Sequence, residues 1–96
     1  MYSRETDEAP MKPTMLNINK AKNLLRAMAE AVDWNAGAAV SPEEASRKQA
    51  LGLSGDELED VEGYMSSQGW IDPTRGAQGA RALTVAGVDV ARKVRT

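Results

Sequence analysis

The sequence predicts a small, mainly helical domain that carries a short β-hairpin. Three observations predict this class. Two helix-start patterns follow one another closely, at 41–44 and at 54–57, with a turn of only three or four residues between their helices. Farther along, a Gly-rich loop separates two short apolar runs, at 70–71 and 81–83. We expect a single domain, because two cores within 96 residues would each be too small to stabilise themselves.

The N-terminal part of the chain divides into a polar tail and a first helix. Residues 1–15 are polar and contain two prolines, so we expect a flexible tail before a domain that spans 16–96. Asn17 or Asn19 can cap the helix, and Asn35 and Gly37 can end it, since these residue types tolerate a left-handed conformation. The predicted core-facing positions are Ala21, Leu24, Leu25, Met28, Ala31 and Val32, with Trp34 over one edge of the core.

Two further helices follow in quick succession. After a short strand at 38–40, Ser41 caps the second helix, proline takes its first position and Glu44 completes a capping box. This helix is expected to run to about Leu51, before Gly52. The third helix begins with the capping box of residues 54–57 and ends at Gly69, and it turns Leu58, Val61 and Met65 inward.

The C-terminal part predicts a hairpin followed by a last helix. Residues 72–79 are dense in turn-forming types, and the flanking runs at 70–71 and 81–83 are short strands. Thr84 can cap a helix of about a dozen residues, whose apolar positions are Val85, Val88, Ala91 and Val94. Gly87, in the first turn of that helix, allows a close approach to a neighbouring element.

This order of elements, with certain residues at its junctions, resembles the winged helix-turn-helix superfamily over residues 19–96. The residues that carry the resemblance are Gly52-Leu53-Ser54, Tyr64-Met65, Gly69-Trp70-Ile71 and Leu83-Thr84-Val85-Ala86-Gly87. A somewhat longer second helix departs from the superfamily's pattern. The resemblance implies a transcription regulator that inserts its third helix in the major groove and places its hairpin, the wing, on the DNA backbone or minor groove. A homodimer on double-stranded DNA is therefore one expected form.

The distribution of charge argues against a simple transfer of that function. Segment 54–72 has six acidic residues and no basic one, whereas 73–96 has five basic residues and one acidic residue. DNA binding depends on Lys and Arg at phosphates, and a carboxylate beside a phosphate costs about 1 kcal/mol in water. We therefore expect DNA contacts from the wing and the second helix, extended by a rim on the first helix. The DNA-contact candidates are Arg75, Arg81, Arg47 and Lys48, and the rim candidates are Lys20, Lys22 and Arg26.

The third helix supports a second hypothesis, a protein-interaction module that does not bind DNA. Its protein-contact candidates are Asp56, Glu59 and Asp60, which would face a basic protein partner. An alternative is that Asp56 and Glu57 only complement the helix dipole while Glu59, Asp60 and Glu62 form a solvated face. Fold frequency favours the regulator and the charges favour the interaction module, and the regulator is slightly preferred overall.

Other kinds of chemistry find little support in the sequence. The chain has no Cys and no His, which excludes disulfides, thiolate zinc sites and histidine bases, so we expect no enzyme and no cofactor. The loop at 76–79 lacks the lysine of a phosphate-binding loop, and carboxylate pairs at helical spacing are more often solvated than metal-binding. Tyr64 and Trp70 are expected to pack at the helix–sheet junction rather than to stack on bases. No membrane span and no signal-peptide core are seen, so a cytoplasmic location is expected.

Overall fold

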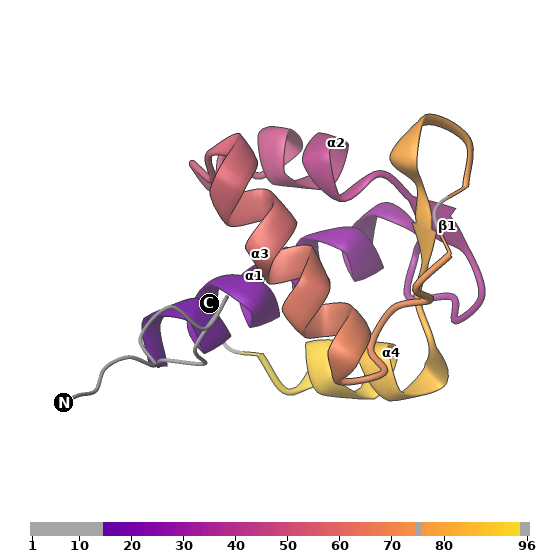
Figure 1. Cartoon of the computed structure of the whole chain (residues 1–96). Helices are drawn as coiled ribbons and strands as arrows, with labels where there is room; N and C mark the ends of the chain where they lie inside the picture. The colour runs from indigo at the N-terminus through magenta and orange to yellow at the C-terminus, as the bar shows by residue number, and fades with distance from the viewer. Residues whose placement is uncertain (1–14, 75, 95–96) are drawn as a thin grey trace, which may run out of the picture.

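The described chain, residues 15–74 and 76–94 of a computed structural model, contains four helices and two short strands (Figure 1). The predicted mainly helical class is confirmed, whereas the two-stranded antiparallel sheet pairs β1 with β2, and Ile71 of the predicted hairpin forms only an isolated bridge with Leu83. Of the expected tail, residues 1–14 lie outside the described part, while residue 15 already belongs to the first helix. In chain order the elements are α1 (Met15–Ala31), β1 (Ala39–Val40), α2 (Pro42–Lys48), α3 (Gly55–Ser67), a 3-10 turn (Ala77–Gly79), β2 (Arg81–Ala82) and α4 (Val85–Arg92).

Helix α1 is the centre of the core, because it packs against α2, α3 and α4. In Figure 1, α2 and α4 lie on opposite sides of the molecule and α3 runs between them. The predicted inward positions of α3 hold, with Val61 and Met65 fully buried and Leu58 packed against the core. The largest fully buried side chains are those of Leu24, Leu25, Met28, Pro42, Val61, Met65, Ile71 and Leu83.

Three helices end in the same way, and two of these ends differ from the prediction. A residue with positive φ follows the last turn of each helix: Asp33 (60°) after α1, Ala50 (54°) after α2 and Gly69 (77°) after α3. The next amide donates back to the helix, at 2.8 Å, 3.0 Å and 3.0 Å respectively, which is the Schellman arrangement. That next residue is apolar each time and packs against the core: Trp34, Leu51 and Trp70.

These ends correct two boundaries. Helix α1 stops at Ala31, with Asp33 in the left-handed position that was expected of Asn35 or Gly37. Helix α2 stops at Lys48 rather than near Leu51, because Ala50 adopts the left-handed conformation two residues before Gly52. Burying the aromatic or aliphatic residue after the turn outweighs the steric cost of the left-handed residue.

The helix starts also differ in how well they were predicted. Helix α1 begins at Met15, so Asn17 and Asn19 lie inside it and the predicted caps are wrong. The box at Ser54 is complete: its hydroxyl accepts from the Glu57 amide at 3.2 Å, and the Glu57 carboxylate accepts from the Ser54 amide at 3.0 Å. At α2 the Ser41 hydroxyl accepts from the Glu44 amide at 3.3 Å, which is half of the predicted box.

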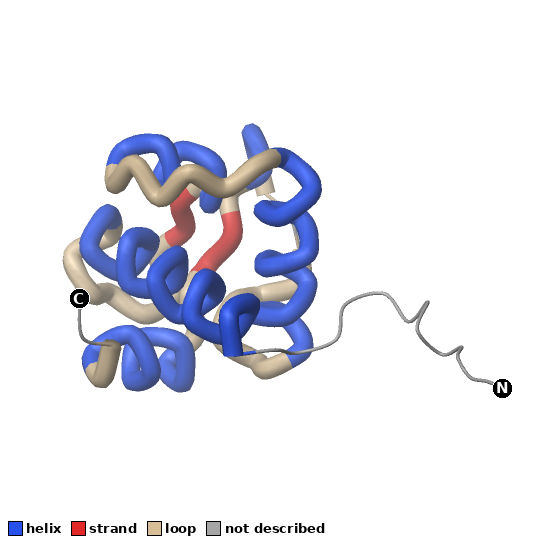
Figure 2. Tube along the Cα trace, turned by 90° about the vertical axis from the view of Figure 1, so that its left-hand side faces the viewer, coloured by secondary structure: helices blue, strands red, loops and turns tan. Residues whose placement is uncertain are grey.

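The hairpin, residues 70–84, joins a small antiparallel sheet. Its two arms are held together by the bridge Ile71↔Leu83 and by a hydrogen bond of 2.8 Å that the Asp72 amide donates to the Ala82 carbonyl. Strand β2 also pairs with β1, in the register Ala39↔Ala82 and Val40↔Arg81. Figure 2 shows the two short strands next to each other within a mainly helical trace. The sheet thus connects the hairpin to the segment between α1 and α2.

Helix α4 closes the core from below α3 in the view of Figure 1. The predicted cap is confirmed, since the Thr84 hydroxyl accepts from the Gly87 amide at 3.0 Å. The predicted close approach at Gly87 is confirmed too, because a Cβ there would lie 2.0 Å from the Trp70 carbonyl oxygen. Val88 and Ala91 are buried, but Val85, which shares their predicted apolar pattern, is 68% exposed. The helix is shorter than predicted and ends at Arg92.

Candidate binding cleft

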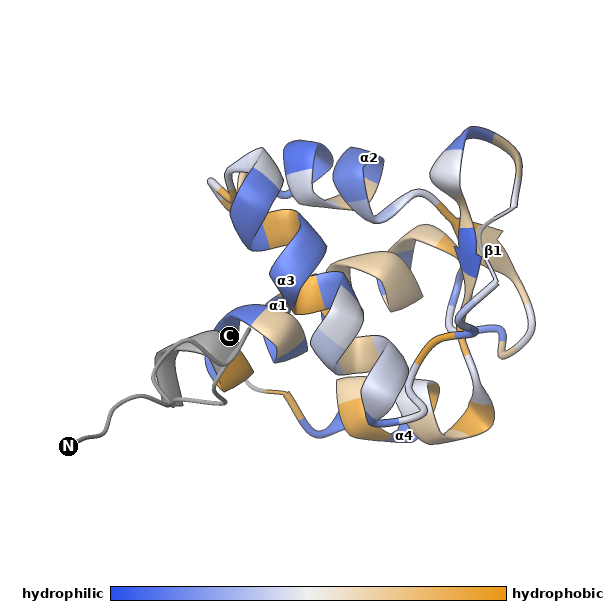
Figure 3. Cartoon of the chain, in the orientation of Figure 1, coloured by the Kyte–Doolittle hydropathy of each residue, from blue (hydrophilic) through white to orange (hydrophobic). Residues whose placement is uncertain are grey.

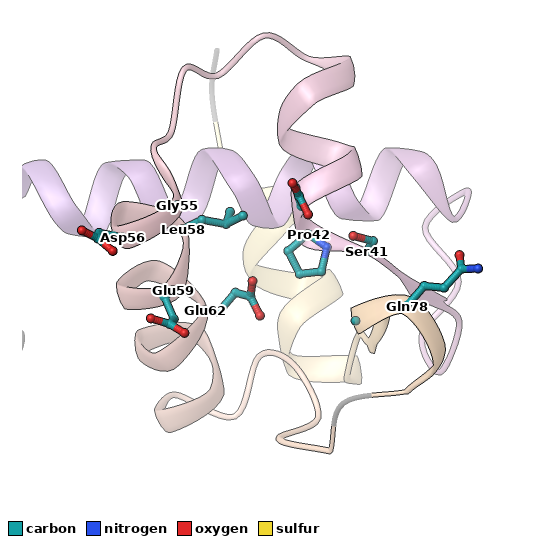
Figure 4. Close-up of a pocket in the computed structure, with 10 residues that line it drawn as sticks. Ser41, Pro42, Gly55, Asp56, Leu58, Glu59, Glu62 and Gln78 are labelled. Atoms are coloured by element: carbon teal, nitrogen blue, oxygen red, sulfur yellow. The ribbon is translucent and has the colours of Figure 1, made fainter.

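A cleft of about 410 Å³ lies between α3, the start of α2 and the hairpin. In Figure 4 the α3 side chains form one wall, Ser41 and Pro42 lie beside them, and Gln78 of the hairpin lies on the opposite side with its side chain directed away from α3. The cleft thus brings together three segments that are far apart in sequence. Its lining residues are Ser41, Pro42, Glu43, Gly55, Asp56, Leu58, Glu59, Glu62, Gln78 and Gly79.

The lining is acidic with a small apolar part. Among these residues are four carboxylates and no Lys or Arg, while Leu58 and Pro42 supply apolar surface. Asp56 and Glu59 are exposed, as the sequence predicted, and Figure 3 shows the hydrophilic turns of α3 alternating with apolar ones. Asp60 is exposed on the same helix but does not line the cleft. Two of the three protein-contact candidates therefore share one concave site.

The burial of Glu62 contradicts the alternative in which Glu59, Asp60 and Glu62 form a solvated face. Glu62 is only 8% exposed, and its carboxylate pairs with the Arg81 guanidinium at 3.3 Å. The burial follows from its position one helical turn after Leu58, on the flank of the inward stripe. Glu62 thus belongs both to the cleft wall and to a buried ion pair.

Arg81, expected on the wing as a DNA contact, is also a residue of the interior. It is 8% exposed, its Nη1 donates to the Asp72 carbonyl at 3.1 Å and the Pro73 carbonyl at 3.4 Å, and its Nη2 lies 3.3 Å from the Glu62 carboxylate. A planar guanidinium can make these contacts on two sides at once. The side chain therefore holds the two arms of the hairpin together and contacts α3.

Of the other DNA-contact candidates, Arg47 and Lys48 lie beside different hollows. Arg47 is exposed and lies 3.8 Å from the Glu43 carboxylate, beside a hollow lined by Leu53 and Leu58. Lys48 lies on a different side of α2, where it lines a hollow with Ala27 and Glu30 of α1. Arg75 lies outside the described residues.

The basic rim expected on α1 is also engaged elsewhere. Lys20 pairs with Glu57 at the start of α3, and this hydrogen bond is the main reason that the pKa of Glu57 is lowered. Arg26 pairs with Glu30 at 3.0 Å and donates to the Val94 carbonyl at 2.7 Å. Lys22, the third rim candidate, is half-buried. Lys20 therefore supports the α3 N-terminus, and Arg26 the end of the described chain.

The aromatic residues act in packing, as predicted. Tyr64 and Trp70 meet edge to face, with ring centroids 5.6 Å apart, and both are partly buried against the core. Trp34 covers an edge of the core near α4, where the Arg92 guanidinium lies 5.4 Å from its ring centroid. Neither arrangement presents two open ring faces for bases.

The sequence did not point to several residues of the cleft. Pro42 and Glu43 were assigned only to a helix start, and Gln78 and Gly79 only to a turn. Their joint position depends on the hairpin folding back toward α2, for which local spacing gives no signal. Leu58 was expected to turn inward, and besides packing against the core it supplies apolar surface at the cleft wall.

The described residues contain no group of three or more acidic side chains placed to hold a metal ion. Within residues 15–74 and 76–94, no helix has the length and apolar character needed to cross a bilayer. No protein-family model, no curated protein and no solved structure matches this chain.

Proposed function

We propose that this chain is a winged-helix interaction module whose acidic cleft binds a basic segment of a partner protein. The order of helices, the α2–α3 pair and the hairpin support a domain of winged helix-turn-helix type. The single observation that carries the function is the composition of the cleft: four carboxylates and no cation line the concave surface between α3 and the hairpin. Such a surface raises the local concentration of cations and speeds the encounter with a basic partner.

The chemistry of the cleft defines the class of segment it would take. A lysine or arginine side chain carries a charged head on an apolar stem, and so matches a site in which Leu58 and Pro42 lie beside Asp56 and Glu59. A segment of several such residues would gain chiefly from Asp56 and Glu59, which are exposed, because Glu62 is paired with Arg81 and Glu43 lies 3.8 Å from Arg47. The complex should weaken with salt, because exposed charges are screened over a distance of about 10 Å at 0.1 M ionic strength.

The DNA-binding regulator suggested by the superfamily fits the charges less well. In that function α3 and the hairpin would meet phosphates, and Asp56, Glu59 and Asp60 would be repelled. Arg81, which should have offset this repulsion, is held inside by Glu62. Binding to duplex DNA is therefore the competing outcome of the experiment, and the expected homodimer stays a prediction.

The experiment compares two labelled probes by fluorescence anisotropy, a short peptide of alternating Lys and Ala and a mixed-sequence DNA duplex. Each is titrated with the protein at about 50 mM and then about 200 mM salt. We expect the peptide to bind at the lower salt concentration and the duplex not to bind. A duplex that binds more tightly than the peptide, and loses affinity steeply with salt, would overturn the proposal in favour of the regulator.

Two matched variants locate the binding site. Glu59→Lys and Asp89→Lys change the net charge equally, but Glu59 lines the cleft whereas Asp89 is exposed on α4. We expect Glu59→Lys to weaken peptide binding about tenfold and Asp89→Lys by no more than about twofold. Equal losses in both variants would show that only net charge matters and that the cleft is not the site.

A further inference from the structure

The hairpin is attached to the rest of the domain along its second arm, where β2 pairs with β1 and the Leu83 amide donates to the Ala38 carbonyl at 3.1 Å. All the described residues of its loop at 72–78 are exposed, and Gly79 and Ala80 are half-buried. Its arms are joined by one bridge and by the amide bonds of Asp72, Gly76 and Thr84, at 2.8 Å, 2.8 Å and 3.1 Å. Ile71 and Leu83 anchor the base in the core, but no buried apolar side chain fixes the described part of the loop beyond them.

Arg81 links this hairpin to α3 and to its own opposite arm. From β2 it reaches across the hairpin to the Asp72 and Pro73 carbonyls, and it reaches α3 through Glu62. Three segments thus meet at one guanidinium: β2, the opposite arm of the hairpin and the cleft wall on α3. Both side chains of the ion pair are 10% exposed, so water screens the contact little.

We propose that Arg81 is a positioning residue, and that the Glu62–Arg81 pair fixes the hairpin against α3 and so sets the width of the cleft. Gln78 and Gly79 of the hairpin line one side of the cleft, and Asp56, Leu58 and Glu59 of α3 line the other (Figure 4). The pair ties these two sides together. When it is removed, the hairpin opens as a local unit while the helical core stays folded. This inference concerns the hairpin alone and holds whether or not the cleft binds a basic segment.

Amide hydrogen exchange tests the proposal, because it measures local opening residue by residue. The main variant replaces the pair with apolar residues, Glu62→Met with Arg81→Leu, so that no unpaired buried charge remains to unfold the domain. We expect the Asp72 and Gly76 amides, which bond to the Ala82 and Ala80 carbonyls, to exchange about tenfold faster or more. The Leu25 and Met28 amides of α1 should change by less than about twofold.

A second Glu–Arg pair in the same chain provides the matched control. Glu43 and Arg47 lie 3.8 Å apart, and their side chains are 73% and 71% exposed, so the pair contributes little. The variant Glu43→Met with Arg47→Leu should leave exchange at Asp72 and Gly76 unchanged. The proposal is overturned if the Glu62/Arg81 variant also leaves these amides unchanged. It is equally overturned if hairpin and α1 amides accelerate by the same factor, which would mean that the pair contributes only to global stability.

A conservative variant keeps the test decisive if the apolar pair does not fold. Arg81→Lys retains a positive charge for Glu62 but loses the fork that reaches Asp72 and Pro73. We expect a selective acceleration at Asp72 and Gly76 that is smaller than in the apolar variant. Exchange at the wild-type rate at both amides in Arg81→Lys would contradict a positioning role for the fork.

Discussion

Gly87→Ala perturbs a close contact between α4 and the backbone of Trp70. The added Cβ would lie 2.0 Å from the Trp70 carbonyl oxygen and 2.9 Å from its carbonyl carbon. Ordinary contact between such atoms needs about 3.5 Å, so α4 and the backbone at Trp70 must separate by more than about 1 Å. Both contacts involve backbone atoms, and a change of side-chain rotamer therefore cannot relieve them.

The elements at this contact are also fixed by hydrogen bonds that a separation would lengthen. The Thr84 amide donates to the Trp70 carbonyl at 3.1 Å, and the Thr84 hydroxyl donates to the Gly69 carbonyl at 2.5 Å. Overpacking typically costs about 1–3 kcal/mol, and weakening the Thr84 cap adds about 1 kcal/mol. Alanine regains up to about 1 kcal/mol through its helix propensity. We expect Gly87→Ala to lower the free energy of unfolding by about 2–3 kcal/mol.

Urea denaturation followed by circular dichroism measures this change. With a slope of about 1–3 kcal/mol per molar urea, the midpoint should fall by about 1 M or more. Gly63→Ala is the matched control: Gly63 is exposed within α3, and a Cβ added there would meet no atom within 4 Å, so this variant should gain about 0.5–1 kcal/mol. A Gly87→Ala midpoint at or above that of the wild type would refute the close contact between α4 and Trp70.

Three further changes test other parts of the fold. Ala50→Gly should raise the free energy of unfolding, measured in urea, by about 0.5–1 kcal/mol, because Ala50 has φ +54° at the end of α2 and glycine adopts this conformation without steric cost. A loss of stability would contradict that helix end. Ser54→Ala should lower the free energy of unfolding by about 1 kcal/mol through loss of the α3 cap, and an unchanged midpoint would contradict the capping box. Lys20, chiefly by its hydrogen bond, lowers the pKa of Glu57 from its ordinary value of 4.5. The stability that the ionised Glu57 carboxylate contributes is therefore complete above pH 4.5, and it is lost as the pH falls through the lower pKa of the folded state. The difference in unfolding free energy between the wild type and Glu57→Gln should therefore shrink between about pH 6 and pH 3, and a difference independent of pH would contradict the Lys20 pairing.

The sequence predicted the parts of the fold that depend on local chemistry. Neighbouring residues alone determine the Ser54–Glu57 capping box and the Thr84 cap. The close approach of α4 to Trp70 needs only that Gly87 has no side chain. The ends of α1 and α2 were missed because Asp33 and Ala50 are not the residue types that favour a left-handed conformation. Their conformation is set by the burial of Trp34 and Leu51, which is a tertiary effect.

The candidate site was predicted less completely, for a related reason. Asp56 and Glu59 were recognised because exposed carboxylates stand out on a helix, but Glu62 and Arg81 were assigned to the surface by their charge. Spacing held a signal for both: Glu62 lies four residues after Leu58, and Arg81 lies two before the buried Leu83, on the same side of a strand. What spacing could not show is that the two buried positions face each other, since they belong to different elements.

The most direct test of an acidic cleft that takes a basic segment is a map of binding on ¹⁵N-labelled protein by NMR. The alternating Lys and Ala peptide is titrated into the protein, and amide shift changes are followed residue by residue. We predict that the changes centre on Asp56, Leu58 and Glu59 of α3 and on Gln78 and Gly79 of the hairpin. Changes absent from these five amides, or produced there by a DNA duplex and not by the peptide, would contradict the proposed function.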